Sequence, residues 1–212
     1  MVSLHPISPS DVADLVRVHS AAFKTDQFSN FMLDGKPPGT HESLMERSIQ
    51  TWISDPTSQL CKAVTEDGDI IGWACWLTKD KSQEKNEPAR PVAQPNPAHI
   101  DKPDPPTRVI GRQMRSDSMA KEAELMTEDK YLVLQAIVVH PDYQRQGIGA
   151  MLIQWGVDRA GKERLSCWCH ASPAGFQLYF KQGFVEQGND EYDLGNFGKY
   201  MFRYMVRRHG FA

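Results

Sequence analysis

The sequence has few cysteines, and their placement does not suggest cross-links or metal. Four occur in 212 residues, at Cys61, Cys75, Cys167 and Cys169. Three fall in apolar, strand-like runs, where a free thiol packs as a small hydrophobic group, so we expect reduced thiols. Cys167 and Cys169, followed by His170, lack the usual gap of about two to four residues and a second ligand pair. No metal site is predicted.

The sequence also lacks an excess of basic residues and a long hydrophobic run. Twenty-four Lys and Arg stand against 27 Asp and Glu, a net charge of −3. A general nucleic-acid binder is usually basic, so binding through Arg203, Arg207 and Arg208 is not expected. No run approaches the about 18 apolar residues of a membrane span, and no basic segment precedes an apolar one near the N-terminus. We expect neither export nor membrane spanning; the default location is cytosolic or nuclear, and we predict the cytoplasm.

Length and composition predict a single domain over residues 1–212. Hydrophobic residues make up 40% and charged residues 24%, close to globular averages. Between residues 80 and 107 seven prolines lie among polar and charged residues, which indicates a Pro-rich insertion. Helical spacing of Ile110, Met114 and Leu125 then predicts an additional helix over residues 108–126.

The remaining pattern predicts an α+β fold with a mixed, mainly antiparallel sheet flanked by helices. Asp67-Gly68 predicts a tight hairpin turn. The segment Thr25–Gly39 is interpreted as a loop that forms a wall. Strands are expected at residues 2–6, 60–66, 70–77, 131–139, 164–171, 185–194 and 200–207, and further helices at 8–24, 40–54, 147–160 and 173–182, the third of these closed by Gly161-Lys162.

A buried strand followed by glycines carries the main chemical signal. Residues 131–139 form a continuous apolar run, and Gly147 and Gly149 follow at the start of a helix. Free N–H groups at such a helix start can converge on an anion, and Arg145 can add a direct phosphate contact. We predict a pyrophosphate site. A nucleotide-triphosphate loop would need Lys-Ser/Thr after Gly149, and a dinucleotide fingerprint would need a small residue at Leu152; an ordinary turn is the remaining alternative.

These residues resemble the GNAT superfamily of acyl-CoA-dependent N-acyltransferases. Its central motif, Q/R-x-x-G-x-G/A after a buried strand, corresponds to Gln144 through Gly149. A second motif, L-Y-x-x-x-G-F after a strand that ends in a small polar residue, corresponds to Leu178 through Phe184. The order of the elements agrees over nearly the whole chain, with residues 80–125 outside the resemblance. The resemblance implies a GNAT fold that binds acetyl-CoA as cosubstrate.

The resemblance also implies roles for individual positions. The backbone of Ile137, Val138 and Val139 would pair with the pantetheine arm where two central strands separate. Ser172 would contact the cofactor, and Tyr179 would protonate the leaving thiolate, which suits a phenol. The pyrophosphate would be held by Gln144, Arg145, Gln146, Gly147, Ile148, Gly149 and Ala150.

The general base is the open question. An alkylamine of pKa about 10.4 is mostly protonated near neutral pH, a handicap of about 4 kcal/mol. Many family members carry a glutamate on the central strand, where this sequence has Gln135 and no carboxylate. His170 at the end of the neighbouring strand is our candidate. His140, Glu128, Asp129 and a water chain stay open, and an acceptor amine of low pKa would need no strong base.

The expected activity is transfer of an acetyl group from acetyl-CoA to a primary amine of a small molecule by direct attack. Phe28, Phe31 and Met32 in the Thr25–Gly39 segment favour a partly apolar acceptor. One alternative is a peptide or protein N-acetyltransferase, with an open groove beside that segment. Another is a CoA-binding domain without catalysis. Neither cysteine of the Cys-x-Cys pair has an evident activating group, so no acetyl-enzyme is expected. We expect a monomer or homodimer.

Overall fold

The computed structural model describes residues 1–84 and 104–210. The strands are β1 (Ser3–Pro6), β2 (Ser58–Val64), β3 (Ile70–Asp80), β4 (Lys130–Val139), β5 (Cys167–Ala171), β6 (Val185–Asp193) and β7 (Lys199–Arg207). The α-helices are α1 (Val12–Phe23), α2 (Gln27–Leu33), α3 (Thr40–Ser54), α4 (Lys81–Glu84), α5 (Pro106–Leu125), α6 (Ile148–Glu163) and α7 (Phe176–Lys181), and the short 3-10 helices are η1 (Pro9–Asp11), η3 (Pro141–Tyr143) and η4 (Gly195–Phe197).

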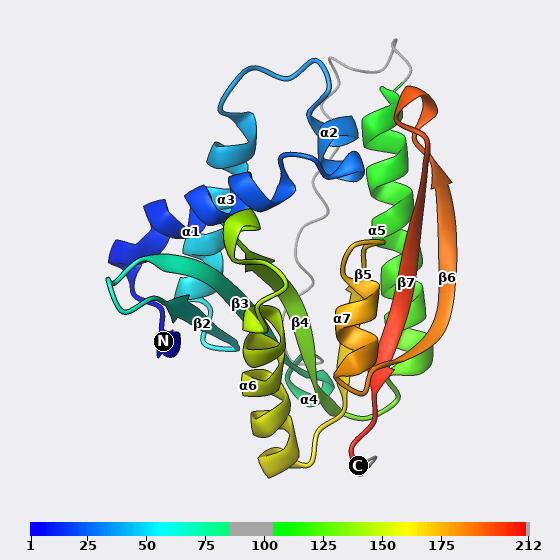
Figure 1. Ribbon diagram of the computed structural model, residues 1–212. Helices are drawn as coiled ribbons and strands as arrows, with labels where there is room; N and C mark the ends of the chain where they lie inside the picture. Colours follow the sequence, from blue (N-terminus) through cyan, green and yellow to red (C-terminus); the bar gives the residue numbers. More distant parts are fainter. Residues whose placement is uncertain (85–103, 211–212) are drawn as a thin grey trace.

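The seven strands form one sheet in the order β1-β2-β3-β4-β5-β7-β6. Neighbouring strands are antiparallel except β4 and β5, which run parallel. The predicted α+β class and the mixed, mainly antiparallel sheet are therefore confirmed. The single parallel pair lies at the centre of the sheet, and Figure 1 shows α6 beside β4 and α7 beside β5.

Helices cover both faces of the sheet and bury two main cores. Alternate residues of a strand point to opposite faces. Leu132 and Leu134 of β4 pack in one cluster with residues of α6 and α7. Val138 and Trp73 pack in a second cluster with Leu15 of α1 and residues of α3. On the same face as α1, α5 lies along β7 and β6 (Figure 1). Among the described residues, no helix combines the length and apolar character that crossing a membrane requires.

The Thr25–Gly39 segment is not the loop that we expected, because its centre folds into α2. Asp26 caps this helix by accepting a hydrogen bond from the Ser29 amide at 2.8 Å. The helix docks against η4 and α5, and seven residues are too few for a stable helix without such packing. Tertiary contact, which hydrophobic spacing over so short a stretch does not reveal, therefore decides its structure.

The predicted end of α6 is also wrong, because the helix continues through Gly161 and Lys162 to Glu163. The left-handed residue that ends it is Arg164, with φ 56°, whose amide bonds back to the carbonyl of Gly161. Glycine usually takes that position, so the sequence signal pointed to the wrong residue.

Most of the predicted Pro-rich insertion lies outside the described residues. On its N-terminal side, β3 extends to Asp80 and is followed by α4. On its C-terminal side, α5 begins at Pro106, an ordinary first position for proline in a helix. The single-domain organisation over residues 1–212 stays a prediction.

Candidate active site

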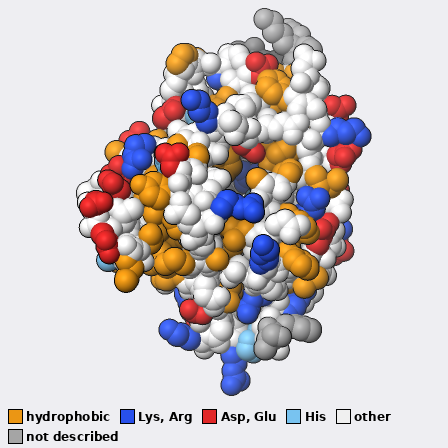
Figure 2. Space-filling view, in the orientation of Figure 1, with side chains coloured by type: hydrophobic (Ala, Val, Ile, Leu, Met, Phe, Trp, Pro, Cys, Tyr) orange, Lys and Arg blue, Asp and Glu red, His pale blue; other side chains and the backbone are white. Residues whose placement is uncertain are grey.

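The central feature of the site is the separation of β4 and β5. These strands pair only at Leu132 with Cys167 and Val133 with Trp168, although β4 continues to Val139 and β5 to Ala171. Beyond those pairs both strands present backbone groups to a gap. Figure 2 shows the molecule in the orientation of Figure 1. The surface is hollowed near the middle of this view, with hydrophobic side chains around the hollow.

Strand alternation decides which backbone groups of β4 face that gap. The His140 amide donates to the Ile71 carbonyl of β3 at 2.8 Å. Two residues earlier, Val138 faces β3 by the same alternation, whereas Ile137 and Val139 face the gap. The Val139 carbonyl there accepts a hydrogen bond from Gln144 Nε2 at 3.1 Å. A ligand that pairs with β4 as an added strand would meet Ile137 and Val139.

A β-bulge lies on β4 at the start of the gap. Cys75 of β3 is opposite Ala136, but its neighbour Trp76 is opposite Leu134, so Gln135 is an extra residue. Leu134 and Ile137 both pack toward α6, which leaves Gln135 and Ala136 between them on the face of α1 and α5. Gln135 is exposed. The bulge therefore places an uncharged amide at the start of the gap.

The predicted pyrophosphate site lies at the N-terminus of α6. Arg145 and Gly147 both have left-handed backbone conformations, with φ 64° and 86°, and no side chain caps the helix. The first helical hydrogen bond runs from the Met151 amide to the Gly147 carbonyl at 3.0 Å. The amides of residues 148–150 precede that bond and have no acceptor within the helix. Unpaired donors and the positive end of the helix dipole fit a phosphate group.

Gln144, Arg145, Gln146 and Gly147 are exposed, as contact with a soluble ligand requires. Gln146 Nε2 donates to the Asp142 carbonyl at 3.1 Å and so stabilises the loop from within.

Gly149 contributes to the packing of α6 against α7. A Cβ atom there would lie 2.8 Å from Leu178 Cδ2 of α7, so the missing side chain lets α6 and α7 approach each other across the gap.

Tyr179 lies on α7 and is 7% exposed. Its ring packs 6.0 Å from the ring of Phe184. Burial, with smaller contributions from Cys169 and Tyr200, raises the pKa of the Tyr179 phenol far above its usual range. The hydroxyl is therefore protonated at physiological pH and is available as a hydrogen-bond donor but not as a base.

Ser172 forms the turn between β5 and α7. Its Oγ accepts a hydrogen bond from the Gly175 amide at 3.2 Å, and the Gly175 and Phe176 amides both bond to the Ser172 carbonyl. Ser172 is half-buried. It fixes the start of the helix that carries Tyr179.

His170 lies two residues beyond Trp168, on the far side of the gap from Gln135. Its ring stacks on Phe202 at 4.6 Å, and its Nδ1 atom is buried without a hydrogen-bond partner. Burial lowers the pKa of His170 to about 4. The imidazole is therefore neutral near pH 7, with one unpaired ring nitrogen, but it is a weak base.

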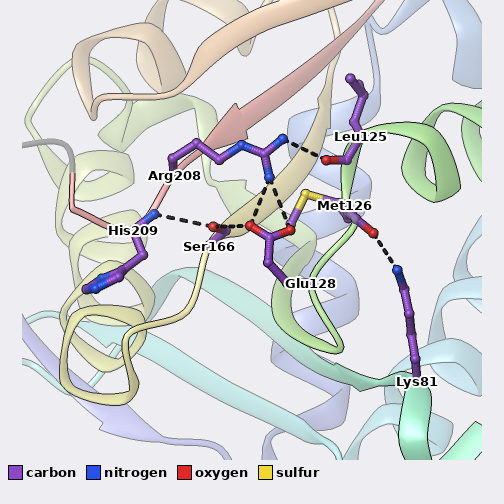
Figure 3. A network of polar contacts seen from close by, with 7 residues as sticks. All are labelled: Lys81, Leu125, Met126, Glu128, Ser166, Arg208 and His209. Atoms are coloured by element: carbon purple, nitrogen blue, oxygen red, sulfur yellow. Dashed lines mark hydrogen bonds and ion pairs between the residues drawn. The ribbon is translucent and has the colours of Figure 1, made fainter.

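Two of the alternative bases lie at the wrong end of β4. Glu128 precedes the strand, whereas the gap follows Val133. Figure 3 shows Glu128 accepting hydrogen bonds from Arg208 at 2.9 and 3.1 Å and from Ser166 at 2.8 Å. Asp129 occupies the same end, where its carbonyl accepts from the Lys81 amide. Neither carboxylate is placed to accept a proton from an amine in the gap.

The same contacts close the C-terminus of α5. Arg208 donates to the Leu125 carbonyl at 2.7 Å, and the Lys81 ammonium donates to the Met126 carbonyl at 2.5 Å (Figure 3). Cations at a helix C-terminus oppose its partial negative charge. Glu128 therefore belongs to a structural network.

His140, a further alternative base, is in the loop after β4. Its Nδ1 accepts a hydrogen bond from the Asp142 amide at 3.4 Å. This bond occupies one ring nitrogen in stabilising η3.

The predicted acceptor wall is largely a packing cluster. Phe31 is 5% exposed and packs edge-on against Phe197 at 5.9 Å. Phe28 lies 5.4 Å from the ring of Tyr200, and Met32 approaches Gly111 of α5. Phe31 therefore anchors α2. Phe28 and Met32 are half-buried, and their contact with an acceptor stays a prediction.

The chemistry of the cysteines suits packing. All four are buried, and burial raises the pKa of Cys167 to about 12 and that of Cys169 well above its ordinary value. A thiol with so high a pKa is a poor nucleophile. Among the described residues, no three metal-binding side chains gather into a site.

The three C-terminal arginines make internal contacts. Arg203 lies 3.5 Å from Glu186 and over the Phe176 ring, and Arg207 donates to the Gln182 carbonyl. Arg208 binds Glu128 as described above.

Three features of the site have no signal in the sequence pattern. The bulge at Gln135 depends on cross-strand register, which a single strand does not reveal. The stacking of His170 on Phe202 joins β5 to β7. In the sequence Gly175 looks like an ordinary turn glycine, and nothing there indicates that it lies beside the Tyr179 ring.

Known proteins share this sequence pattern and fold. Residues 25–184 match the acetyltransferase (GNAT) family profile. An acetyltransferase of Stachybotrys chartarum is 22% identical over an alignment of 224 residues, gaps included. The alignment covers 97% of this chain and 92% of that protein. Arylalkylamine N-acetyltransferase 2 from Aedes aegypti superposes with a TM-score of 0.70 at 16% identity, covering 99% of each chain. A histone acetyltransferase HPA2 and related acetyltransferase from Corynebacterium glutamicum gives 0.61 at 17% identity, covering 100% of this chain and 98% of the other. Identities this low establish the shared fold alone.

Proposed function

Because the chain belongs to the GNAT family of acetyltransferases, we propose that it transfers an acetyl group from acetyl-CoA to the primary amine of a small molecule by direct attack. The observation that carries the proposal is the gap between β4 and β5 beside the uncapped N-terminus of α6. Bound acetyl-CoA supplies an activated acetyl thioester. The remaining steps belong to residues of this chain.

The binding step uses backbone groups more than side chains. The unpaired amides of residues 148–150, with Gln144, Arg145, Gln146 and Gly147 around them, would hold the pyrophosphate. The gap-facing backbone of Ile137 and Val139 would pair with the pantetheine arm, and Ser172 would border it from β5. Because Val138 faces β3, we assign it no hydrogen bond to this ligand.

Tyr179 is the proposed general acid. Its buried phenol stays protonated because charge is costly there. As the carbon–sulfur bond breaks, the phenol would donate its proton to the departing thiolate. The leaving group would then depart as the thiol and not as a free thiolate.

His170 is proposed to contact the attacking amine through its half-buried ring, whose Nδ1 atom is itself fully buried. With a pKa of about 4, its imidazole is far too weak a base to hold the proton of an alkylammonium ion, whose pKa is about 10.4. The acceptor must therefore reach the site as the neutral amine. This condition favours amines of low pKa and makes the rate depend on the acceptor's own titration.

The acceptor is proposed to be small and partly apolar. Phe28 of α2 and Phe202 of β7 pack against one aromatic cluster, and both are half-buried. The fold is also similar to that of an arylalkylamine N-acetyltransferase, which supports an arylalkylamine as the first acceptor to try. A peptide or protein acceptor is the alternative. Both the cytoplasmic location and the monomeric or homodimeric state remain predictions.

Ligand binding is the first test. In a thermal-shift titration, acetyl-CoA at about 100 times its dissociation constant should stabilise the protein by about 2.7 kcal/mol. Gly147→Glu should abolish this shift by adding bulk and negative charge at the helix start. The matched control is Gly68→Glu in the β2–β3 turn, since Gly68 also has a left-handed backbone and open space around it. Equal ligand shifts in both variants would refute the binding site.

Turnover is the second test. CoA release should be measured with aromatic amines, aliphatic amines and peptides. Tyr179→Phe should keep the acetyl-CoA shift and lose turnover by about 100-fold or more. Activity on peptides alone would favour the alternative acceptor, whereas binding without turnover on any amine would favour a non-catalytic CoA-binding domain.

A further inference from the structure

We propose that Gly175 is a positioning residue whose missing side chain sets the location of the Tyr179 hydroxyl. This inference rests on the proposed function, in which Tyr179 protonates the leaving thiolate. Gly175 lies directly before α7, one helical turn ahead of Tyr179. A Cβ atom at Gly175 would lie 3.0 Å from Tyr179 Cε2 and 3.4 Å from its hydroxyl oxygen.

Space is the reason for this glycine, because its backbone conformation does not require one. Its φ is −86°, which every residue adopts readily. Gly147 shows the opposite case, with a left-handed φ of 86° and nothing within 4 Å of an added Cβ. At Gly175 the backbone would accept alanine, but the phenol ring occupies the space that the methyl group needs.

Tyr179 cannot move away as a whole. Its amide bonds to the Gly175 carbonyl at 3.3 Å, and the Leu178 amide bonds to the same carbonyl at 3.0 Å. The backbone distance between the two residues is therefore fixed by the first turn of α7. The Tyr179 ring is buried and packs against Phe184. An added methyl group would lie close to both Cε2 and the hydroxyl oxygen. Rotation about the Cβ–Cγ bond leaves the oxygen in place, because it lies on that axis. The methyl group would therefore be accommodated mainly by a swing of the ring about the Cα–Cβ bond, which moves the hydroxyl more than Cε2.

The turn before α7 provides a second fixed point. Ser172 Oγ accepts the Gly175 amide at 3.2 Å and also lies 3.4 Å from the added Cβ position. An alanine is therefore confined between Ser172 and the Tyr179 ring. The backbone cannot relieve the contact with the ring without disturbing this hydrogen bond.

Proton donation depends on distance, so a displaced hydroxyl should slow the reaction. In the proposed step the amine nitrogen bonds to the acetyl carbon as the carbon–sulfur bond breaks. The thiolate takes the Tyr179 proton, the amine proton passes to solvent, and the phenolate regains a proton from solvent. Gly175→Ala should lower kcat with acetyl-CoA about tenfold or more, while the dissociation constant of acetyl-CoA changes less than about threefold.

The test compares two acetyl donors with one acceptor amine. Acetyl-CoA releases a basic thiolate, whereas 4-nitrophenyl acetate releases an anion that needs no protonation. Gly175→Ala should lose about tenfold or more with acetyl-CoA and less than about threefold with 4-nitrophenyl acetate. The control is Gly161→Ala in α6, where nothing lies within 4 Å of an added Cβ; it should behave as wild type with both donors. In the Tyr179→Phe background, Gly175→Ala should cause no further loss.

Unchanged turnover of acetyl-CoA in Gly175→Ala would overturn the inference and leave the proposed function intact. Equal losses with both donors, or a loss that adds to that of Tyr179→Phe, would also overturn it, because a general packing defect behaves in that way. A wild-type protein that acetylates no amine would overturn the proposed function, and this inference with it.

Discussion

Gln135 and His170 belong to the two strands that border the gap, each two residues beyond the last paired residues of β4 and β5, Val133 and Trp168. Both belong to the face of the sheet that α1 and α5 cover. One offers an uncharged amide, the other an imidazole that burial keeps neutral. Neither can remove a proton from an alkylammonium ion efficiently. This pair therefore determines the pH dependence expected of the reaction.

We expect kcat/KM to rise with pH along the titration of the acceptor amine. Between two acceptors that differ in amine pKa, the midpoint of the rise should move by the same difference. The measurement is the initial rate of CoA release from pH 6 to 10 for both amines. A common midpoint for the two acceptors would instead reveal an enzyme base.

Gln135→Glu should add the missing base. The position is exposed at a bulge, so a carboxylate costs little in stability. We expect kcat/KM for an alkylamine near pH 7 to increase about tenfold or more. Gln187→Glu on the exposed edge strand β6 makes the same charge change away from the gap and should have no effect. A decrease with Gln135→Glu would show that the amide itself binds the acceptor.

Gly156 and Gly161, both in α6, should respond in opposite ways to alanine. A Cβ at Gly156 would lie 2.0 Å from Trp76 Cε2, whereas one at Gly161 meets nothing within 4 Å. Trp76 is fully buried, so Gly156→Ala should destabilise the fold by about 3 kcal/mol or more. Gly161→Ala should stabilise it by about 0.5 to 1 kcal/mol through helix propensity. Chemical denaturation of both variants provides the measurement, and similar effects would contradict the packing of α6 on β3.

Glu128→Gln should reduce stability without altering the chemistry. Glu128 and Arg208 are both about one third exposed, so solvent screening limits the loss to about 1 kcal/mol. The variant should keep its kcat and its pH profile. A large loss of kcat with unchanged stability would return Glu128 to consideration as the base.

Much of the fold could be predicted because its signals are local. The apolar run at residues 131–139 predicts a buried strand. The glycines at 147 and 149 predict a helix start with free amide groups. The failures involve partners distant in sequence. The short helix α2 depends on packing of Phe31 against Phe197, and the end of α6 depends on Arg164 taking a conformation that glycine usually takes.

The candidate site shows the same division. The unpaired amides at the start of α6 follow from the glycine pattern, so sequence reasoning found them. Gln135 could be identified as a missing carboxylate, but its bulge follows only from the register against Cys75 and Trp76. The neutral state of His170 follows from burial against Phe202, a residue 32 positions later in the printed sequence. Chemistry set by such contacts cannot be derived from spacing.

The fold should lose stability at mildly acidic pH because of His19. This residue is 8% exposed between α1 and α3, and its Nδ1 atom lies 2.8 Å from His41 Nε2. Burial first and His41 second lower the pKa of His19 to about 3. Below pH 6.5 the unfolded chain binds a proton that the folded chain takes up only near pH 3. The free energy of unfolding therefore falls as pH decreases through this window, by up to about 1.4 kcal/mol per pH unit.

Chemical denaturation of His19→Asn between pH 7 and pH 5 tests whether His19 causes this loss of stability. Asparagine keeps a polar group near the Nδ1 position and does not titrate. The variant should show a shallower loss of stability with falling pH than wild type, whatever its stability at pH 7. His5→Asn on the exposed strand β1 is the matched control and should keep the wild-type slope. Burial of His170, whose pKa is lowered to about 4, adds a second contribution in the upper part of the same window. Some slope should therefore persist in His19→Asn, and a slope equal to that of wild type would show that His19 accepts its proton in the folded state.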